Sequence, residues 1–369
     1  MNSRMIGNSG PATRHLLALL VVTSLAFTAD QLASAQESTA QETAETDVRI
    51  VPPQQYEQHE QEQEGRQRWE IREQSSEPVS QQTEYLRMRR DEDGNDVALQ
   101  TSITRFRPDD GDVIIDLVGA VHIGDGDYYR KLNRQFELYD VVLYELVAQQ
   151  GTRVPAGGAG PSDNPIGMLQ QSAQRMLGLE SQLALIDYQA ENFVHADLSP
   201  AEMQQKMAER GDSMLTVGLD AISEMIRNQN RAMQEAQNDS DNVVDDSAGG
   251  MFDLMGDPQQ MKRMMAMQFT EGGGMDLGLG QSLNQILIDD RNEAAMRVLQ
   301  QQLVNGQKRI AIFYGAAHMA DFEQRLVNNF GLQMTEQVWV DAWDLNREIE
   351  TDMSDPMNMM MQLLNSLDE

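Results

Sequence analysis

The chain has 369 residues, of which 40% are hydrophobic and 24% are charged, so it can form one large domain or two small ones with a hydrophobic core. Its net charge is −31, from 59 acidic and 28 basic residues. Because nucleic acids and anionic membranes are bound by basic surfaces, this charge argues against both as partners.

The first 35 residues are typical of a cleavable secretory signal. Arg4, Arg14 and His15 precede the apolar run Leu16–Phe27, which ends before the small-residue sequence Ala33-Ser34-Ala35. The run is too short for an ordinary spanning helix. We therefore expect an exported protein, periplasmic or secreted, with no membrane contact after cleavage; an uncleaved anchor is the alternative.

Residues 36–82 are rich in Gln and Glu and contain few apolar residues, which predicts a disordered spacer. His59 lies among its glutamates, and a solvated linker histidine is a simpler interpretation than a metal-binding tail. This spacer is expected to lead directly into the folded part of the chain.

Order is predicted to begin near Thr83. Thr83–Arg90 and Val97–Phe106 flank the turn-rich sequence DEDGND, as in a β-hairpin. Asp112–Gly119 is a predicted third strand, Tyr128–Tyr139 has helical spacing, and Val141–Val147 is another apolar strand. Strand, helix and strand in this order indicate a βαβ unit of an α/β protein.

Helices are predicted to dominate the middle of the chain, after a Gly- and Pro-rich loop at Gln150–Asp163. Ser181–Phe193 is one predicted helix. A second opens at Leu198–Glu202, where Ser199 suits the N-cap and Glu202 the reciprocal capping position. Two loops, at Asn238–Gly250 and Glu271–Gly280, interrupt this region.

A long amphipathic helix at Ser282–Val304 leads into the predicted strand Arg309–Gly315, and a last strand is expected at Glu336–Ala342. Methionines cluster at Met261–Met267 and at Met357–Met361. Thioether clusters can bind Cu(I), but filling of the core or a greasy contact surface is the favoured interpretation. The Met-rich tail, 346–369, ends in a short helix or a frayed segment.

Two segments of the chain resemble each other: DLVGAVHIGDGDYYRKL, Asp116–Leu132, and AIFYGAAHMADFEQRL, Ala311–Leu326. Each is an apolar strand followed by Gly-Ala-x-His, an Asp and a helix. This repeat predicts two equivalent βα units that place His122 and His318 just past a strand's carboxyl end, where ligands bind in open α/β sheets. The glycine before each histidine would permit a turn or a close approach of another group.

A third strand adds a carboxylate, because Val141–Glu145 ends with Glu145 in the corresponding position. An acid after an apolar run is expensive to bury unless it is paired or binds a ligand. One such residue is usually just exposed. Three at like positions, two of them in a repeat, predict a functional site.

The two GxxH motifs, Gly119–His122 and Gly315–His318, together with Glu145, resemble the TraB/PrgY/GumN family. That family is related to the Tiki metalloproteases and more remotely to the erythromycin-esterase and ChaN-like haem-binding folds. Asp290-Arg291-Asn292 and His195–Ser199 resemble further segments of the family, and the resemblance covers about Val113–Leu345. The chain departs from it at Ala120, where Thr is frequent, and at Met319-Ala320-Asp321, where a small residue or glycine is frequent.

The resemblance implies an exported metal-dependent hydrolase, with peptide bonds as substrate in the Tiki branch. With no cysteine in the chain, the ligands would be His122, His318 and Glu145, a set that suits Mn, Co, Zn or Fe. Arg291 would stabilise an oxyanion or a substrate carboxylate.

Other residues near the motifs are expected to have supporting parts. Asp125 and Asp321 would orient the ligands from behind, although helix N-caps are the favoured interpretation for both. His195 lies outside the motifs and is interpreted as structural.

Three alternatives remain open. One is a metal-free hydrolase, in which a histidine oriented by Glu145 acts as general base. Another is a non-enzymatic protein that binds haem or sequesters a peptide. The last is a structural exported protein whose Met-rich helices contact partners.

The predicted architecture is α/β (α+β): a central mixed sheet of two related βα halves in a catalytic domain at 83–345, with a helical insertion at about 165–300. The expected partner is a peptide or small-molecule substrate.

Overall fold

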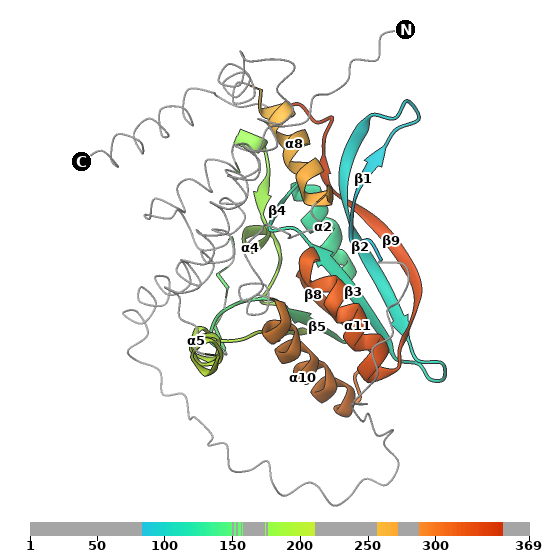
Figure 1. The fold of residues 1–369 in the computed structure, drawn as a ribbon, viewed down its shortest axis with the longest axis vertical. Coiled ribbons are helices and arrows are strands. Elements are labelled where there is room, and N and C mark those ends of the chain that lie inside the picture. The colour runs from blue at the N-terminus through green and yellow to red at the C-terminus, as the bar shows by residue number, and fades with distance from the viewer. Residues whose placement is uncertain are drawn as a thin grey trace, which may run out of the picture.

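The computed structural model describes residues 83–149, 151, 152, 154, 155, 157, 174, 176–210, 257–271 and 288–349. The predicted signal, the spacer, the loops at 238–250 and 272–280 and most of the Met-rich tail lie outside these residues. The described part is organised around one large sheet, with helices on both of its faces (Figure 1).

The large sheet has seven strands in the order β1-β2-β3-β8-β5-β7, and β9 also pairs with β2. Its strands are β1 (Leu86–Arg90), β2 (Asp96–Arg107), β3 (Ile114–Ala120), β5 (Val141–Tyr144), β7 (Phe193–His195), β8 (Arg309–Gly315) and β9 (Gln333–Asp344). Two short strands, β4 (Ile123–Gly124) and β6 (Glu180–Ser181), pair separately. The predicted hairpin and every predicted strand are present.

The sheet is mixed, as predicted. β3, β8, β5 and β7 run parallel to one another, whereas β2 is antiparallel to β1, β3 and β9. The two strands of the repeated motif, β3 and β8, are direct neighbours, with Ala120 opposite Gly315. The motif histidines therefore start from adjacent strand ends.

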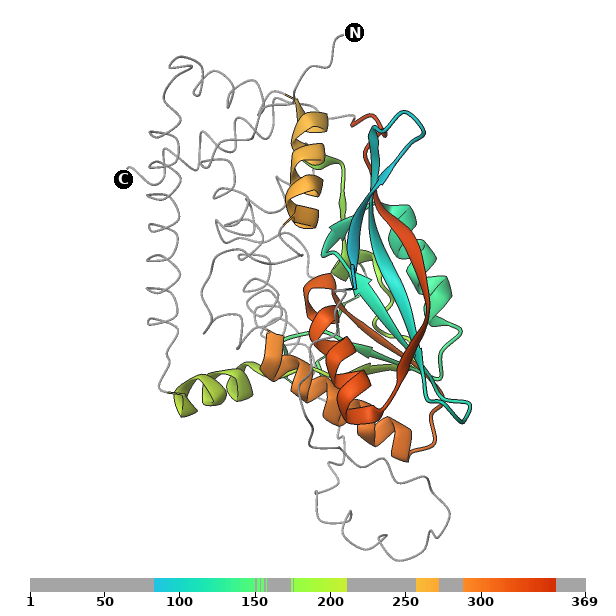
Figure 2. The ribbon, with the colours of Figure 1, turned by 45° about the vertical axis from the view of Figure 1, so that its right-hand side comes forward.

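Alternation along the parallel strands divides the core between the two faces of the sheet. Val118, Phe313 and Tyr144 belong to the core on one face, with the helix α2 (Gly126–Phe136). Leu117 and Ile312 face the other core, under α10 (Asp290–Val304) and α11 (Met319–Phe330). Figure 2 shows α2 and α11 on opposite faces of the sheet.

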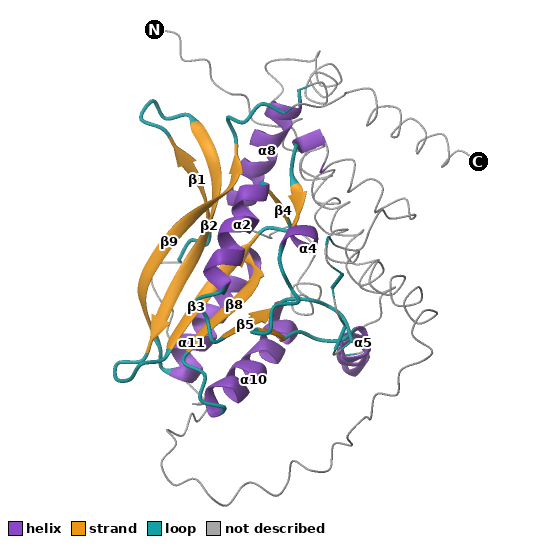
Figure 3. Cartoon of the chain, turned by 180° about the vertical axis from the view of Figure 1, so that it is seen from behind, coloured by secondary structure: helices purple, strands orange, loops and turns teal. Residues whose placement is uncertain are grey.

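Three further helices surround the carboxyl ends of the parallel strands. They are α4 (Gln182–Leu185), α5 (Pro200–Glu209) and α8 (Pro258–Glu271), seen from behind in Figure 3. On α8, Met265 is buried in the core beside α2, and Met261 and Met264 pack against it, so these three methionines fill the core, whereas Met267 is exposed. Among the residues that the structure describes, none of the helices is long and apolar enough to cross a membrane.

The predicted helix at Ser181–Phe193 is wrong. Only α4 is helical, and the segment ends in the strand β7, which pairs in parallel with β5. Asn133 of α2 donates to the Leu185 carbonyl and accepts from the Asp187 N–H, and Asp187 in turn accepts from the Gln189 N–H. These local hydrogen bonds replace helical ones, and β5 gains its second neighbour in the sheet.

The predicted capping box at the start of α5 is confirmed. The Ser199 hydroxyl accepts from the Glu202 N–H at 3.2 Å, and the Glu202 carboxylate accepts from the Ser199 N–H at 2.8 Å. Ser199→Ala should lower the free energy of unfolding by about 1 kcal/mol, measured by urea denaturation. Ser181, at the start of α4, has no side-chain cap bond, so Ser181→Ala is the matched control and should change little. Equal losses for both would contradict the cap's contribution.

A buried polar site at the carboxyl ends of the parallel strands

The parallel register brings the predicted site residues to one edge of the sheet. Gly315 is paired with the end of β3, and the Glu145 N–H donates to Phe313 of β8 at 3.2 Å. A Cβ atom on Gly315 would lie 3.3 Å from Glu145 Oε2, 3.7 Å from His318 Cδ2 and 3.9 Å from His122 Nε2. The three predicted ligands therefore converge on Gly315, and the glycine permits this close approach.

Glu145 is a buried carboxylate with a partner for each oxygen. Arg291 Nη2 donates to Oε1 at 2.7 Å, and the Gly315 N–H donates to Oε2 at 2.7 Å. Burial raises the pKa of Glu145, but Arg291, the two histidines and the Gly315 N–H together hold it well below its ordinary value. Glu145 is therefore an anion at every working pH.

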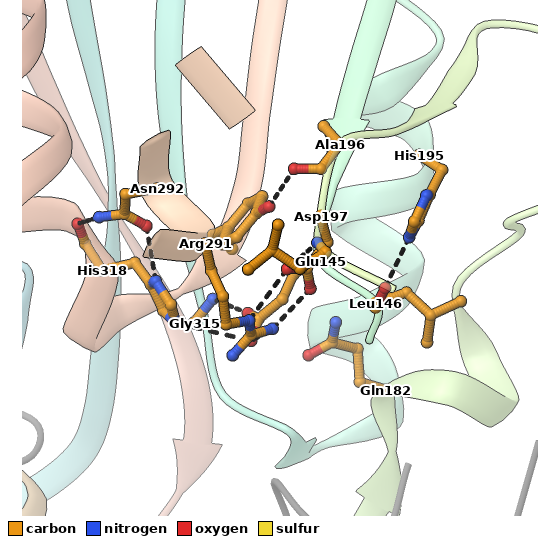
Figure 4. Close-up of polar contacts among 12 residues, drawn as sticks. Glu145, Leu146, Gln182, His195, Ala196, Asp197, Arg291, Asn292, Gly315 and His318 are labelled. Carbon is orange, nitrogen blue, oxygen red and sulfur yellow. Dashed lines mark hydrogen bonds and ion pairs between the residues drawn. The ribbon is translucent and has the colours of Figure 1, made fainter. Parts of the chain in front are cut away.

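Arg291 lies between two carboxylates (Figure 4). Besides Glu145, it binds Asp197 through two hydrogen bonds, from Nε at 3.0 Å and from Nη2 at 2.6 Å. Arg291 is 1% exposed, and its cation offsets the buried charge of both acids. Because Nε and Nη2 both donate to these carboxylates, the geometry favours a role for Arg291 in fixing Glu145. Its contact with an oxyanion of the substrate stays a prediction.

Asp197 was not predicted as a site residue. It follows β7 and precedes α5, and 94 positions separate it from Arg291. Only the resemblance to the TraB/PrgY/GumN family pointed to its segment, His195–Ser199, because the spacing of residues along the chain does not reveal a partner as distant as Arg291. The strand end at β7, adjacent to β5 in the sheet, is what brings it to the site.

His318 is held in one orientation by Asn292. The ring Nδ1 lies 2.7 Å from Asn292 Oδ1, and Asn292 Nδ2 donates to the His318 carbonyl and to Asp321 Oδ2. Because the amide oxygen only accepts, Nδ1 carries the ring proton and Nε2 has a free lone pair. This Nε2 is buried without a hydrogen-bond partner, 3.6 Å from Glu145 Oε1.

The protonation of His318 follows from its surroundings. Burial lowers its pKa to about 4, and the opposing attraction of Glu145 does not compensate. The ring is therefore neutral near pH 7. Asp321 accepts a hydrogen bond from Asn292, which agrees with a part in orienting His318. The favoured interpretation of Asp321 as a helix N-cap is wrong, because the N-cap of α11 is His318 and Asp321 lies in the first turn.

His122 is the more accessible histidine of the pair, half-buried at the end of the first motif. Its backbone carbonyl accepts from the Gln182 N–H at 2.9 Å. Asp125 occupies the N-cap position of α2 but makes no side-chain cap bond, so the predicted cap is wrong in its chemistry. Its carboxylate accepts from the Asp344 N–H and lies 3.5 Å from the buried Lys262 Nζ.

His195 lies outside the converging group, as predicted for a structural residue. Its Nε2 is hydrogen-bonded to the Leu146 carbonyl at 2.6 Å, and its ring packs edge-on against Tyr144. Gly119 lies within β3, where a Cβ would meet the Ser102 carbonyl at 3.4 Å, so it serves close packing and not a turn.

The predicted metal ligands fit a divalent ion in their chemistry. His318 Nε2 is a buried lone pair without a partner, and neighbouring ligands of a tetrahedral ion with bonds of about 2.1 Å lie about 3.4 Å apart, close to the 3.6 Å between Nε2 and Glu145 Oε1. Within the described ranges, no group of three or more His, Asp or Glu side chains is already gathered as a metal site. His122 would have to move closer to complete the set.

Acid should destabilise the metal-free protein between pH 6.5 and 4. The pKa of His318 falls from 6.5 to about 4 on folding, so in this window the unfolded chain binds more protons and the free energy of unfolding decreases as pH falls. Glu145, whose pKa is lowered from 4.5, adds to the loss as pH falls through about that value, at the acid end of this window. Urea denaturation of the parent and of His318→Gln at pH 7, 6, 5 and 4 checks this. An equal slope in both proteins would contradict it.

The chain was compared with protein-family models, curated proteins and solved structures, and none of them matches. The resemblance of the GxxH motifs to the TraB/PrgY/GumN family therefore stays a prediction, and the geometry of the site carries the functional argument.

Proposed function

We propose that the protein is a metal-dependent hydrolase acting on peptide-like substrates, with His122, His318 and Glu145 as the ligands of a divalent ion. One observation carries the proposal: a neutral, buried imidazole nitrogen without a partner faces a permanent carboxylate at 3.6 Å. Two facing lone pairs require a cation or a hydrogen donor between them. A bound divalent ion would supply a water of lowered pKa and polarise the substrate carbonyl.

The chain's own residues have separate parts in this reaction. Asn292 fixes the His318 tautomer, so that Nε2 presents its lone pair. Arg291 and the Gly315 N–H fix Glu145 as an anion beside it. Each Glu145 oxygen keeps a second lone pair beside its hydrogen bond, so the carboxylate could hold the ion together with His318.

Metal content is the direct test. Protein purified without a His tag should hold about one divalent ion per chain by elemental analysis, and His318→Ala and Glu145→Ala should each lower this at least about tenfold. Dialysis against a chelator should remove hydrolysis of a peptide library, and Mn, Co, Zn or Fe should restore it. His195→Ala is the control and should keep the ion. Full metal content in both site variants would refute this ligand set.

A second candidate is a metal-free hydrolase, and one observation favours it. Both oxygens of Glu145 already accept charge-assisted or backbone hydrogen bonds, so the carboxylate is held as a fixed anion beside His318. In this case His318 Nε2 takes the proton of a water, the resulting hydroxide attacks the carbonyl, and the imidazolium returns the proton to the leaving group. Activity that survives complete chelation would support this candidate.

The proposed function includes an architecture and a location. We propose that β3–α2 and β8–α11 are the two related halves of a catalytic domain, and that α4, α5 and α8 belong to a helical insertion between them. The similarity of the two motifs and the adjacency of β3 and β8 support this. The predicted signal sequence supports export of the enzyme.

A further inference from the structure

Gln182 and Tyr188 form a hydrogen-bonded pair beside the site that the proposed reaction does not use. The Gln182 N–H donates to the His122 carbonyl at 2.9 Å, and β6, immediately before Gln182, pairs with β4, immediately after His122. Gln182 is therefore attached to the backbone of the first motif histidine. Figure 4 shows its side-chain amide pointing toward the side of the site that holds Glu145 and Arg291.

The pair has hydrogen-bonding capacity left over. Gln182 is 4% exposed, and its Nε2 donates to the Tyr188 hydroxyl at 2.8 Å. Gln182 Oε1 is buried without any partner. Because the Tyr188 oxygen accepts from Gln182, its own proton is free to be donated elsewhere, and among the described residues the hydroxyl makes only this one bond. One acceptor and one donor thus remain unmatched, next to each other.

Packing holds the pair rigid. The Tyr188 ring contacts Tyr144 at 5.2 Å and Phe193 at 5.8 Å between centroids. Tyr144 immediately precedes Glu145 in the chain, so the same strand end positions both. Burial raises the pKa of Tyr188 well above its ordinary value, with a smaller contribution from the charge of Glu145, so the hydroxyl stays protonated and acts as a donor.

A fixed donor beside a fixed acceptor is complementary to a secondary amide, which offers a carbonyl oxygen and an N–H. We propose that Gln182 and Tyr188 bind a backbone amide of the substrate, with Tyr188 donating to its carbonyl and Gln182 Oε1 accepting from its N–H. This rests on the proposed hydrolase function and adds its specificity contacts. An ester at the same position leaves Gln182 Oε1 unpaired, and a buried site that loses such a bond discriminates strongly.

The test compares an amide with its matched ester in the full-length chain. The probes are N-acetyl-trialanine methylamide and analogues in which one backbone N–H at a time is replaced by oxygen. Binding is measured by calorimetry on chelator-treated protein, and hydrolysis separately on untreated protein. One ester position should weaken binding at least about tenfold in the parent. Gln182→Met should weaken binding of the amide probe to the level of that ester in the parent. The amide and the ester should then bind this variant equally, as expected if Gln182 contacts the substrate N–H.

Tyr188→Phe should weaken binding of the amide probe and of the ester probes by the same factor, because the lost hydrogen bond goes to the carbonyl that all of them share. Tyr139→Phe is the matched control: its buried hydroxyl donates to Asp116 at 2.7 Å, near the opposite end of β3 from the site, and its loss should not change the amide–ester difference. An unchanged difference in Gln182→Met, or no binding of the amide probe by the parent, overturns the inference. Gln182-dependent binding without hydrolysis of any probe would instead overturn the proposed function and leave the inference standing.

Discussion

Arg291→Met is expected to lower the free energy of unfolding by about 3–5 kcal/mol. The variant keeps the packing volume of the side chain but leaves Glu145 and Asp197, both less than one-tenth exposed, without their shared cation. Two uncompensated buried carboxylates repel each other, and protonation of one of them relieves the repulsion. The variant should therefore also become more stable, relative to the parent, as pH is lowered from 7 to 5.

Urea denaturation at both pH values measures this effect. Arg297→Met is the control on the same helix, since its partner Glu293 and the arginine itself are both more than half exposed, and surface pairs of this kind contribute little. Adding Asp197→Asn to Arg291→Met removes one of the two orphaned charges and should recover part of the loss. A loss below about 1 kcal/mol for Arg291→Met would mean that water solvates the cluster, contrary to its burial.

The fold was predictable where the sequence has strong periodicity and clear ends. The apolar runs that became β3, β5 and β8 are short, β-branched and bounded by polar residues, and their buried register leaves little choice of structure. Ser181–Phe193 failed for the opposite reason. Its helical spacing was overridden by hydrogen bonds from Asn133, a residue of a different element, and by the open edge of β5. Tertiary partners of this kind leave no local signal.

The site was predictable as a set of strand ends but not as a network. The repeat placed His122 and His318 in equivalent positions, and parallel neighbours necessarily present their carboxyl ends at one edge. The partners that fix these groups come from afar, as Asp197 does for Arg291 and Gln182 for His122. Asn292 was visible only as part of a resemblance, and its hydrogen bond to the ring required the packing of α10 against α11.

His318→Ala should lower kcat/KM for a cleaved peptide by about a thousandfold or more, and Glu145→Gln should do the same. The two side chains face one position, because Nε2 and Oε1 lie 3.6 Å apart, and in the proposed reaction each is useful only when the other is present. The double variant should therefore be about as active as either single variant, far from the product of the two losses. Steady-state kinetics on the four proteins measure this coupling.

Asn292→Ala separates orientation from chemistry in the same assay. Without the amide oxygen, His318 Nδ1 no longer has its fixed acceptor, so the proton can move to Nε2 and block the lone pair that faces Glu145. We expect a loss of about 10- to 100-fold in kcat/KM, smaller than that of His318→Ala. Adding Asn292→Ala to His318→Ala should cause little further loss, because Asn292 acts through the His318 ring. His195→Gln is the matched histidine control, because its ring is bonded to the Leu146 carbonyl and contacts none of the converging groups. For the pair His318→Ala and Glu145→Gln, a double variant whose loss of kcat/KM equals the product of the two single losses would show that the side chains act independently. That result would contradict their joint action at one site.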